Sequence, residues 1–341
     1  MEGITPPKET GFKMIMRDLT VLSFGGGQDS TALLMLLIYS PEFRAKYVKG
    51  ELIVIMADTG NEHPYTYDHV EHTKKLCKDH GIPFFFITEA MGFHRPSWPN
   101  LITPQLRSDS DKYQATMVQS GTKSCTLQLK VDPIYKFVDE YLNGQYQMGF
   151  KRHSGRGCAK QAIKKFQKAG NKIHVMIGFA FGEESRAEKS IKLQASEQKT
   201  PGKWQQVLNR IFPLIDLKMD RKACADLCEE KLGYEVMPSN CMLCPYQSPA
   251  ELLWLARNYP RMWETWVTIE ANKIERNKHL EGTMVTNKRT GKEKPFKNQG
   301  VYCTPKLLPA RLIEAQAKFG HLSQAELHEY KKFHGCATNA M

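Results

Sequence analysis

The chain has 341 residues, and its hydrophobic content of 41% and charged content of 25% are ordinary for a soluble globular protein. Lysine and arginine outnumber the acidic residues by 48 to 36, and the resulting net charge of +12 favours polyanionic partners such as nucleic acids and nucleotides. There is no signal-peptide pattern and no apolar run near the ~20 residues of a membrane span, so we expect a cytoplasmic protein. In such a protein we expect the nine cysteines to serve metal binding, thiol chemistry or burial rather than disulfides.

The N-terminal part alternates strand and helix patterns. Apolar runs predict buried strands at 19–24, 52–57 and 82–87. Helices are predicted at 29–39 and 65–80, the second ended by a glycine at position 81. This β-α-β-α-β order predicts a parallel sheet with helices on both faces, the doubly wound α/β class.

The rest of the chain is predicted to be more helical. Residues 91–124 are rich in Pro, Ser and Trp and predict irregular structure, and one further core strand is expected at 173–179. Helices are predicted at 131–142, about 159–169, 216–232, 249–257 and 260–277, with one more short helix beyond 322. We therefore divide the chain into a nucleotide-binding α/β domain at 1–215 and a helical, cysteine-bearing region at 216–341.

Two stretches are strongly basic. Residues 145–172 carry eight Lys or Arg and no acid, and residues 286–297 have a basic, loop-like composition. Such an acid-free stretch can hold DNA or RNA by its phosphates, and we predict a nucleic-acid contact for 145–172. A solubilising surface is the alternative for both stretches.

The sequence LSFGGGQDSTALL at 22–34 places three glycines between the first predicted strand and the first helix. Gly25, Gly26 and Gly27 let backbone N–H groups approach an anion, and the helix dipole adds to the attraction. Hydroxyls of Ser23, Ser30 and Thr31 can donate to phosphate oxygens. Asp29 can cap the helix or help to hold Mg²⁺.

Two familiar glycine motifs do not fit this loop. It lacks the Gly-Lys-Ser/Thr of a Walker A loop and the G-x-G-x-x-G spacing of a dinucleotide fold. A plain strand-to-helix turn is the structural alternative, but three glycines followed by Asp-Ser-Thr exceed what such a turn needs. The composition favours a phosphate cradle.

The segment SFGGGQDST resembles the PP-loop of the ATP pyrophosphatases and PAPS reductases, whose pattern is S-G-G-x-D-S. Glycine replaces the first serine, with Ser23 two places earlier. Further segments are similar to this family in the same order: ADTGNEHPYTY, SCTLQLKVDPI, IGFAFGEESR, and FPLIDLKMDRKAC followed by SNCMLCPYQSPAEL. The last pair resembles a phage- and bacteria-associated branch that includes the DndC-like DNA phosphorothioation proteins. The resemblance implies an adenine nucleotide alpha-hydrolase-like fold that binds ATP.

The matching segments contain further candidate site residues. Asp58 ends a predicted strand, where an acid can bond a ribose hydroxyl or a metal or can cap a helix, and Glu62 and Tyr65 are weaker candidates. Arg186 offers paired donors to phosphate or sulfate. Glu183 can pair with it or bind metal, with a surface ion pair as the alternative. By its position in the resembled family, Lys130 is a similar candidate for the catalytic set.

Cys241 and Cys244 form a C-x-x-C-P motif, a spacing at which two thiolates can hold one metal or cluster. Cys125 and Cys224 match cysteine positions of the resembled branch, with Cys228 and Cys303 as alternatives. The resemblance favours a [4Fe-4S] cluster over a structural Zn²⁺, and spacing alone suits both. Coincidence or burial is the alternative.

The resemblance implies an enzyme that binds ATP with Mg²⁺, adenylates an acceptor and releases pyrophosphate. We expect nucleic-acid modification by sulfur transfer, with a sulfur-donor protein as a further partner and no membrane partner. Two alternatives are a sulfonucleotide reductase, whose thiol candidate is Cys336 in an atypical tail, and a binding module that does not turn over its nucleotide.

Overall fold

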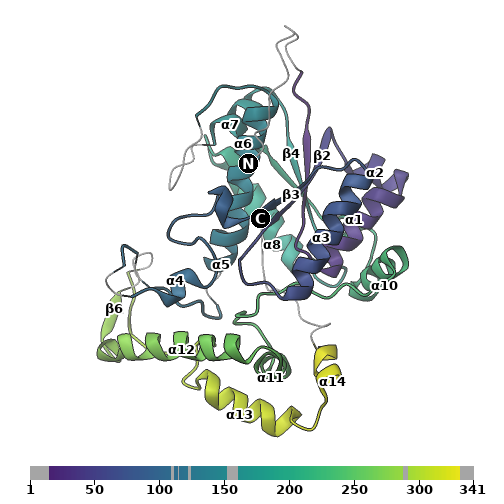
Figure 1. Cartoon of the computed structure of the whole chain (residues 1–341). Helices are drawn as coiled ribbons and strands as arrows, with labels where there is room; N and C mark the ends of the chain where they lie inside the picture. The colour runs from purple at the N-terminus through teal and green to yellow at the C-terminus, as the bar shows by residue number, and fades with distance from the viewer. Residues whose placement is uncertain are drawn as a thin grey trace.

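The computed structural model describes residues 15–108, 111–113, 115–121, 124–151, 160–286 and 291–330. Its centre is a five-stranded sheet in the order β3-β2-β1-β4-β5, in which every neighbouring pair is parallel (Figure 1). The strands are β1 (Leu19–Ser23), β2 (Glu51–Ala57), β3 (Phe84–Ile87), β4 (Ile173–Ile177) and β5 (Leu208–Ile211). The four predicted strands are confirmed to within about two residues at each end, and β5 is an addition.

Helices cover both faces of the sheet, which confirms the predicted α/β class with a parallel sheet and is consistent with a doubly wound fold. One face carries α6 (Asp132–Gln145), α7 (Gln161–Lys168) and α8 (Glu184–Lys199). The other face carries α1 (Gln28–Tyr39), α2 (Pro41–Tyr47), α3 (Pro64–Asp79) and α10 (Arg221–Leu232).

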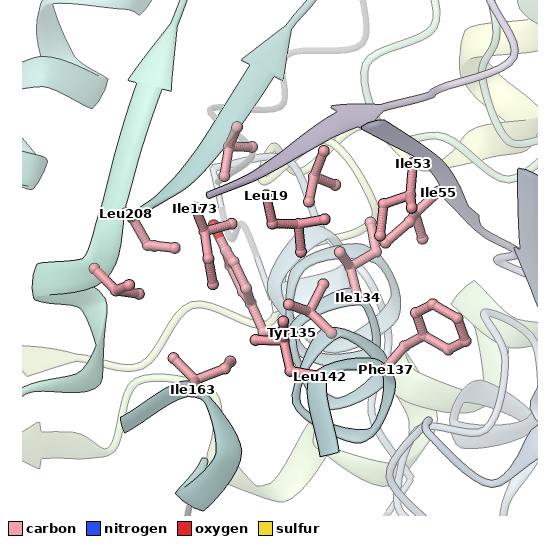
Figure 2. Close-up of a cluster of buried hydrophobic side chains, with 14 of the residues drawn as sticks. Leu19, Ile53, Ile55, Ile134, Tyr135, Phe137, Leu142, Ile163, Ile173 and Leu208 are labelled. Carbon is pink, nitrogen blue, oxygen red and sulfur yellow. The ribbon is translucent and has the colours of Figure 1, made fainter. Parts of the chain in front are cut away.

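Alternation along the strands supplies both cores. Successive side chains of a strand point to opposite faces, so Ile53 and Ile55 join one hydrophobic cluster while Val54 joins the other. Figure 2 shows the first cluster, where strand side chains such as Leu19 meet Ile134 and its neighbours on α6. Each strand therefore has to be apolar on both sides, which explains the continuous apolar runs of the sequence.

The C-terminal part is helical, as predicted, and lies beyond one edge of the sheet (Figure 1). It contains α11 (Pro249–Asn258), α12 (Pro260–Arg276), α13 (Leu308–Phe319), α14 (Gln324–Glu329) and a hairpin of β6 (Met284–Thr286) and β7 (Glu293–Pro295). Its core also takes in residues from the irregular segment, such as Trp98 and Val118. Segments far apart in the sequence therefore share one hydrophobic cluster.

The helix predicted at 216–232 is two elements, α9 (Pro213–Asp216) and α10. Cys224 and Cys228 of α10 are buried in the same cluster as α1, so this helix packs on the sheet layer rather than with the C-terminal helices. The predicted division at residue 215 thus falls within α9 and before α10, a helix that packs on the sheet.

Short helical turns complete the described chain. They are a 3₁₀ turn at Glu89–Met91, α4 (Thr103–Leu106), α5 (Ser124–Thr126), a π-helical turn at Leu127–Val131, and 3₁₀ turns at Trp204–Val207 and Lys278–Leu280. Among the helices of the described residues, none has the length and apolar character needed to cross a bilayer.

Candidate functional site

The loops after β1 and β4 meet at the carboxyl edge of the sheet. β1 and β4 are neighbours, and the chain builds the sheet outward from them in opposite directions, which makes this a topological switch point. Ligands of open α/β sheets bind in the crevice at such a point. A Cβ on Gly178 would lie 3.0 Å from the Ser30 nitrogen, so glycine lets the loop after β4 contact the first turn of α1.

Two of the three glycines, Gly26 and Gly27, are required by the backbone of the loop. Gly26 has a φ of +73°, which side-chain-bearing residues rarely adopt, and a Cβ on Gly27 would lie 2.7 Å from the Ser239 nitrogen. Ser239 belongs to the segment that follows α10, and no pattern in the sequence predicts that this segment packs against the loop. The glycines therefore serve both a left-handed turn and a close approach of two backbone segments.

The hydroxyls of the loop hold it in shape. Ser30 Oγ accepts from the Gly25 nitrogen at 3.1 Å and donates to the Gly27 carbonyl at 3.0 Å, and Thr31 Oγ1 donates to the same carbonyl at 3.0 Å. Ser30 and Thr31 are buried, and Ser23 is partly buried at the end of β1. We predicted these hydroxyls as phosphate donors; in this structure those of Ser30 and Thr31 brace the loop.

The N-terminus of α1 has the features of an anion site. Its N-cap, Gly27, makes no side-chain capping bond, and the helix runs for 12 residues, so its dipole points at the loop. Asp29 lies in the first turn, and its Oδ1 atom is buried without a hydrogen-bond partner among the described residues. Burial raises the pKa of Asp29 to about 6, against the lowering effect of Arg221 and Arg186. A buried carboxylate oxygen of this kind suits a metal ligand.

Two arginines from different elements share one carboxylate beside Asp29. Glu183 Oε1 lies 2.5 Å from Arg186 Nη1 and 2.9 Å from Arg221 Nη2, and its other oxygen accepts from the Ala180 nitrogen at 3.3 Å. The Arg186 guanidinium also stacks 4.2 Å above the ring of Phe179. The structure therefore brings together three predicted residues, Asp29, Glu183 and Arg186, and adds Arg221, whose functional position the sequence did not mark.

Asp58 directly follows β2 at the same edge of the sheet. Its Oδ1 accepts from the Gly60 nitrogen at 2.8 Å and from the Tyr67 hydroxyl at 2.9 Å. Burial raises the pKa of Asp58, although these two hydrogen bonds act to lower it. The carboxylate shapes the turn that leads into α3.

Glu62 is more central than its sequence indicated. It is fully buried, and its Oε1 accepts from Thr59 Oγ1 at 3.0 Å and pairs with Lys130 Nζ at 3.5 Å. The Cys241 thiol lies 3.6 Å from the same oxygen, and burial with the nearby Glu62 charge raises the pKa of Cys241 well above its usual range. Lys130 thus lies in a buried polar cluster with Glu62 and Cys241, separate from the arginine pair.

The predicted cysteine set is divided between two regions. Cys224 is buried between α10 and α1, where neighbouring Cys228 donates to the Gln28 carbonyl at 3.4 Å. Cys125 and Cys241 pack on the cluster of the C-terminal part, and the Cys244 nitrogen donates to the Cys241 carbonyl at 3.2 Å. Over the described residues there is no group of three or more His, Cys, Asp or Glu side chains that could hold a metal ion. The four cysteines in this arrangement do not fit one cluster or zinc site. The alternative Cys303 is exposed and donates to the Ser120 carbonyl at 3.1 Å.

The two described ends of the predicted basic segment lie at the opposite edge of the sheet. Near its start, the Tyr146 hydroxyl accepts from the Arg17 nitrogen at 3.3 Å, and at its end the Lys172 nitrogen donates to Asp18 at 2.8 Å, just before β1 and β4 begin. The exposed lysines among its described residues are Lys151, Lys164, Lys165, Lys168 and Lys172. Both described ends are thus a strand length away from the glycine loop, and residues 152–159 and Cys336 lie outside the described residues.

A cavity of about 200 Å³ opens beside the glycine loop, on the side of α3. Its walls are Gly26, Tyr65, Asp68, His69, His72, Tyr234, Glu235, Val236 and Met237. Four of these residues follow the i, i+3, i+4, i+7 face of α3, so a helical stripe of polar and aromatic side chains was the available sequence signal.

Neither the family models nor the curated proteins include a match to this chain.

Proposed function

We propose that the chain is a PP-loop enzyme of the adenine nucleotide alpha-hydrolase-like class, which binds ATP at the glycine loop and transfers its AMP moiety to an acceptor. The observation that carries this proposal is the uncapped N-terminus of α1, with its glycine loop, beside Arg186 and Arg221 at the switch point of the sheet. Backbone N–H groups, a helix dipole and two guanidinium groups are complementary to a polyphosphate.

In the proposed reaction an acceptor oxygen attacks the α-phosphorus of ATP. A new phosphorus–oxygen bond forms, the bond between the α-phosphorus and the bridging oxygen breaks, and pyrophosphate leaves. Most of the catalysis is positioning and neutralisation of charge. A guanidinium has five N–H donors, so each arginine can bond Glu183 and a phosphate together.

Asp29 is the residue best suited to hold Mg²⁺ in this site. Its buried Oδ1 has no hydrogen-bond partner among the described residues, and Mg²⁺ prefers carboxylate oxygens together with phosphate oxygens. The ion would supply charge to the leaving pyrophosphate. The iron–sulfur cluster has no such support, because the predicted cysteines lie in two regions, and no step is assigned to it.

For the acceptor we propose a nucleic acid. Sulfide-level sulfur of a donor protein would then attack the adenylated atom, so that a bond to sulfur forms, the bond to the AMP-bearing oxygen breaks and AMP leaves. The net charge of +12 and the exposed lysines at the far edge of the sheet support a polyanionic partner. Because those lysines and the glycine loop lie at opposite edges, the nucleic acid would have to extend across the domain. A short oligonucleotide should therefore be a poorer acceptor than a long one.

ATP–pyrophosphate exchange by the full chain, with and without DNA or RNA, tests the proposal. Exchange is expected for the wild type and for Lys222→Ala, which removes an exposed lysine next to Arg221. It is expected to be lost in Arg221→Ala and Arg186→Ala. Absence of exchange in the wild type under every condition would exclude adenylation, and exchange that survives both arginine substitutions would place the site elsewhere.

A further inference from the structure

One wall of the cavity beside α3 is formed by His69 and Tyr234, which are hydrogen-bonded to each other and, through His69, to Thr31. His69 Nε2 lies 2.9 Å from Thr31 Oγ1, and His69 Nδ1 lies 3.0 Å from the Tyr234 hydroxyl. Burial, with a smaller contribution from nearby His72, lowers the pKa of His69 to about 4, so the ring is neutral at pH 7. A neutral imidazole has one donor nitrogen and one acceptor nitrogen.

The direction of each hydrogen bond follows from the glycine loop. Thr31 Oγ1 donates its only hydroxyl proton to the Gly27 carbonyl, and we therefore assign His69 Nε2–H as the donor to Thr31 Oγ1. His69 Nδ1 is then the acceptor, and the Tyr234 hydroxyl must donate its single proton to it. The Tyr234 hydroxyl can therefore only accept a hydrogen bond from any further partner.

The other polar groups of the cavity are also mainly acceptors. Asp68 and Glu235 contribute carboxylates, and both side chains are exposed at its rim. The rings of Tyr65 and Tyr234 supply aromatic faces. The Tyr65 hydroxyl is buried without a hydrogen-bond partner among the described residues and can bond in either direction. His72 also lines the cavity, and its ring offers one donor and one acceptor when neutral. Two carboxylates and the Tyr234 oxygen make the lining richer in acceptors than in donors, although the chain carries a net charge of +12.

These features favour a ligand with positive charge and several N–H donors over a phosphate. Carboxylates and a tyrosine oxygen complement the N–H groups of such a ligand, while aromatic faces attract a cation at short range. We propose that this cavity binds an alkyl guanidinium or ammonium group, as a small molecule or as an arginine or lysine side chain of a partner. The site adjoins Gly26 of the glycine loop, and its test does not require a nucleotide.

Calorimetric titration of the full chain with n-butylguanidinium and with neutral, similarly shaped n-butylurea tests the proposal. We expect the guanidinium to bind and the urea to bind at least about tenfold more weakly. A blocked Gly-Arg-Gly peptide, compared with the same peptide containing citrulline, shows whether a side chain within a polypeptide also fits. Binding of the small guanidinium alone identifies a small-molecule site, and binding of both identifies a site open to a protein partner.

Three variants locate the binding. The double substitution Asp68→Asn with Glu235→Gln should reduce guanidinium affinity at least about tenfold, since it removes both charges from exposed positions. Glu71→Gln, an exposed carboxylate on α3 that pairs with Lys74 outside the cavity, should leave the affinity unchanged. Tyr234→Phe keeps the ring and removes the acceptor oxygen, so it should weaken binding while preserving the fold.

Two results would overturn the proposal. One is equal binding of butylguanidinium and butylurea, or no binding of either, by the wild-type chain. The other is a nitrogen-15 spectrum in which His69 carries its proton on Nδ1, because the Tyr234 proton would then be directed elsewhere. Neither result depends on ATP, so failure of this proposal is distinguishable from failure of the proposed function.

Discussion

Replacement of Asp29 by asparagine should make the protein more stable and less active. The buried carboxyl has a pKa of about 6 in the folded chain against an ordinary value of 3.8, so the folded state holds its proton more tightly than the unfolded state. As pH rises from 3.8 towards 6, the unfolded chain ionises first and the free energy of unfolding falls. Relative to a carboxyl that stays protonated, the ionising Asp29 lowers the free energy of unfolding by about 3 kcal/mol at pH 7. At pH 4.5 it lowers the free energy of unfolding by about 1 kcal/mol.

Asparagine has a similar shape and no charge, so the variant should not lose unfolding free energy through ionisation at this position. Urea unfolding at the two pH values should show an advantage over wild type that grows by about 2 kcal/mol from pH 4.5 to pH 7. Asp226→Asn, which changes an exposed carboxylate on α10, is the matched control and should show no such growth. An Asp29→Asn advantage that is equal at both pH values, or a loss of stability at pH 7, would refute the argument that Asp29 is a buried, strained charge. The same variant should lose pyrophosphate exchange, since the carboxylate is assigned to Mg²⁺.

Three further outcomes follow from the structure. Gly27→Ala should destabilise the fold by about 1–3 kcal/mol, because its Cβ would lie 2.7 Å from a backbone nitrogen. Gly144→Ala on α6, which has open space around it, should instead stabilise the fold by about 0.5–1 kcal/mol. Chemical denaturation of the two variants measures both changes. Arg186→Lys should weaken ATP binding at least about tenfold, because lysine cannot form the paired contacts of a guanidinium, and a change below twofold in calorimetry would contradict that role. Cys224→Ala should leave the iron and zinc content of purified protein unchanged, and loss of metal on this substitution would show that α10 belongs to a metal site.

The strands of the sheet were predictable where burial on both faces demands an unbroken apolar run. The strand at Leu208–Ile211 was missed because its sequence, LNRI, alternates buried and partly buried residues at the edge of the sheet. The helix at Glu184–Lys199 was missed for a similar reason, since it buries only Ala187, Ser190 and Glu197 and has no apolar stripe.

The glycine loop and its neighbours show where sequence reasoning reaches its limit. The turn conformation of Gly26 follows from local chemistry, but the need for glycine at position 27 depends on Ser239, more than two hundred residues away. Arg221 reaches Glu183 only because α10 packs on α1. Such tertiary pairs leave no local pattern in one sequence.

The cysteines of α10 show how a resemblance can outweigh a simpler physical signal. Cys224 and Cys228 are four residues apart, a spacing that places both on one face of a helix. Buried cysteine behaves as a small hydrophobic residue, and here the pair faces α1 in the core. The structure thus supports the burial alternative for these two positions, while Cys241 lies with Glu62 and Lys130.

The central claim is that the glycine loop binds ATP for cleavage at the α-phosphorus, and the fate of labelled phosphate tests it most directly. The full chain is incubated with long DNA or RNA and ATP labelled at either the α- or the γ-phosphate, and the products are separated. We predict γ-label in pyrophosphate and α-label in AMP or an adenylated acceptor. Appearance of the γ-label as inorganic phosphate, with ADP as the other product, would contradict it.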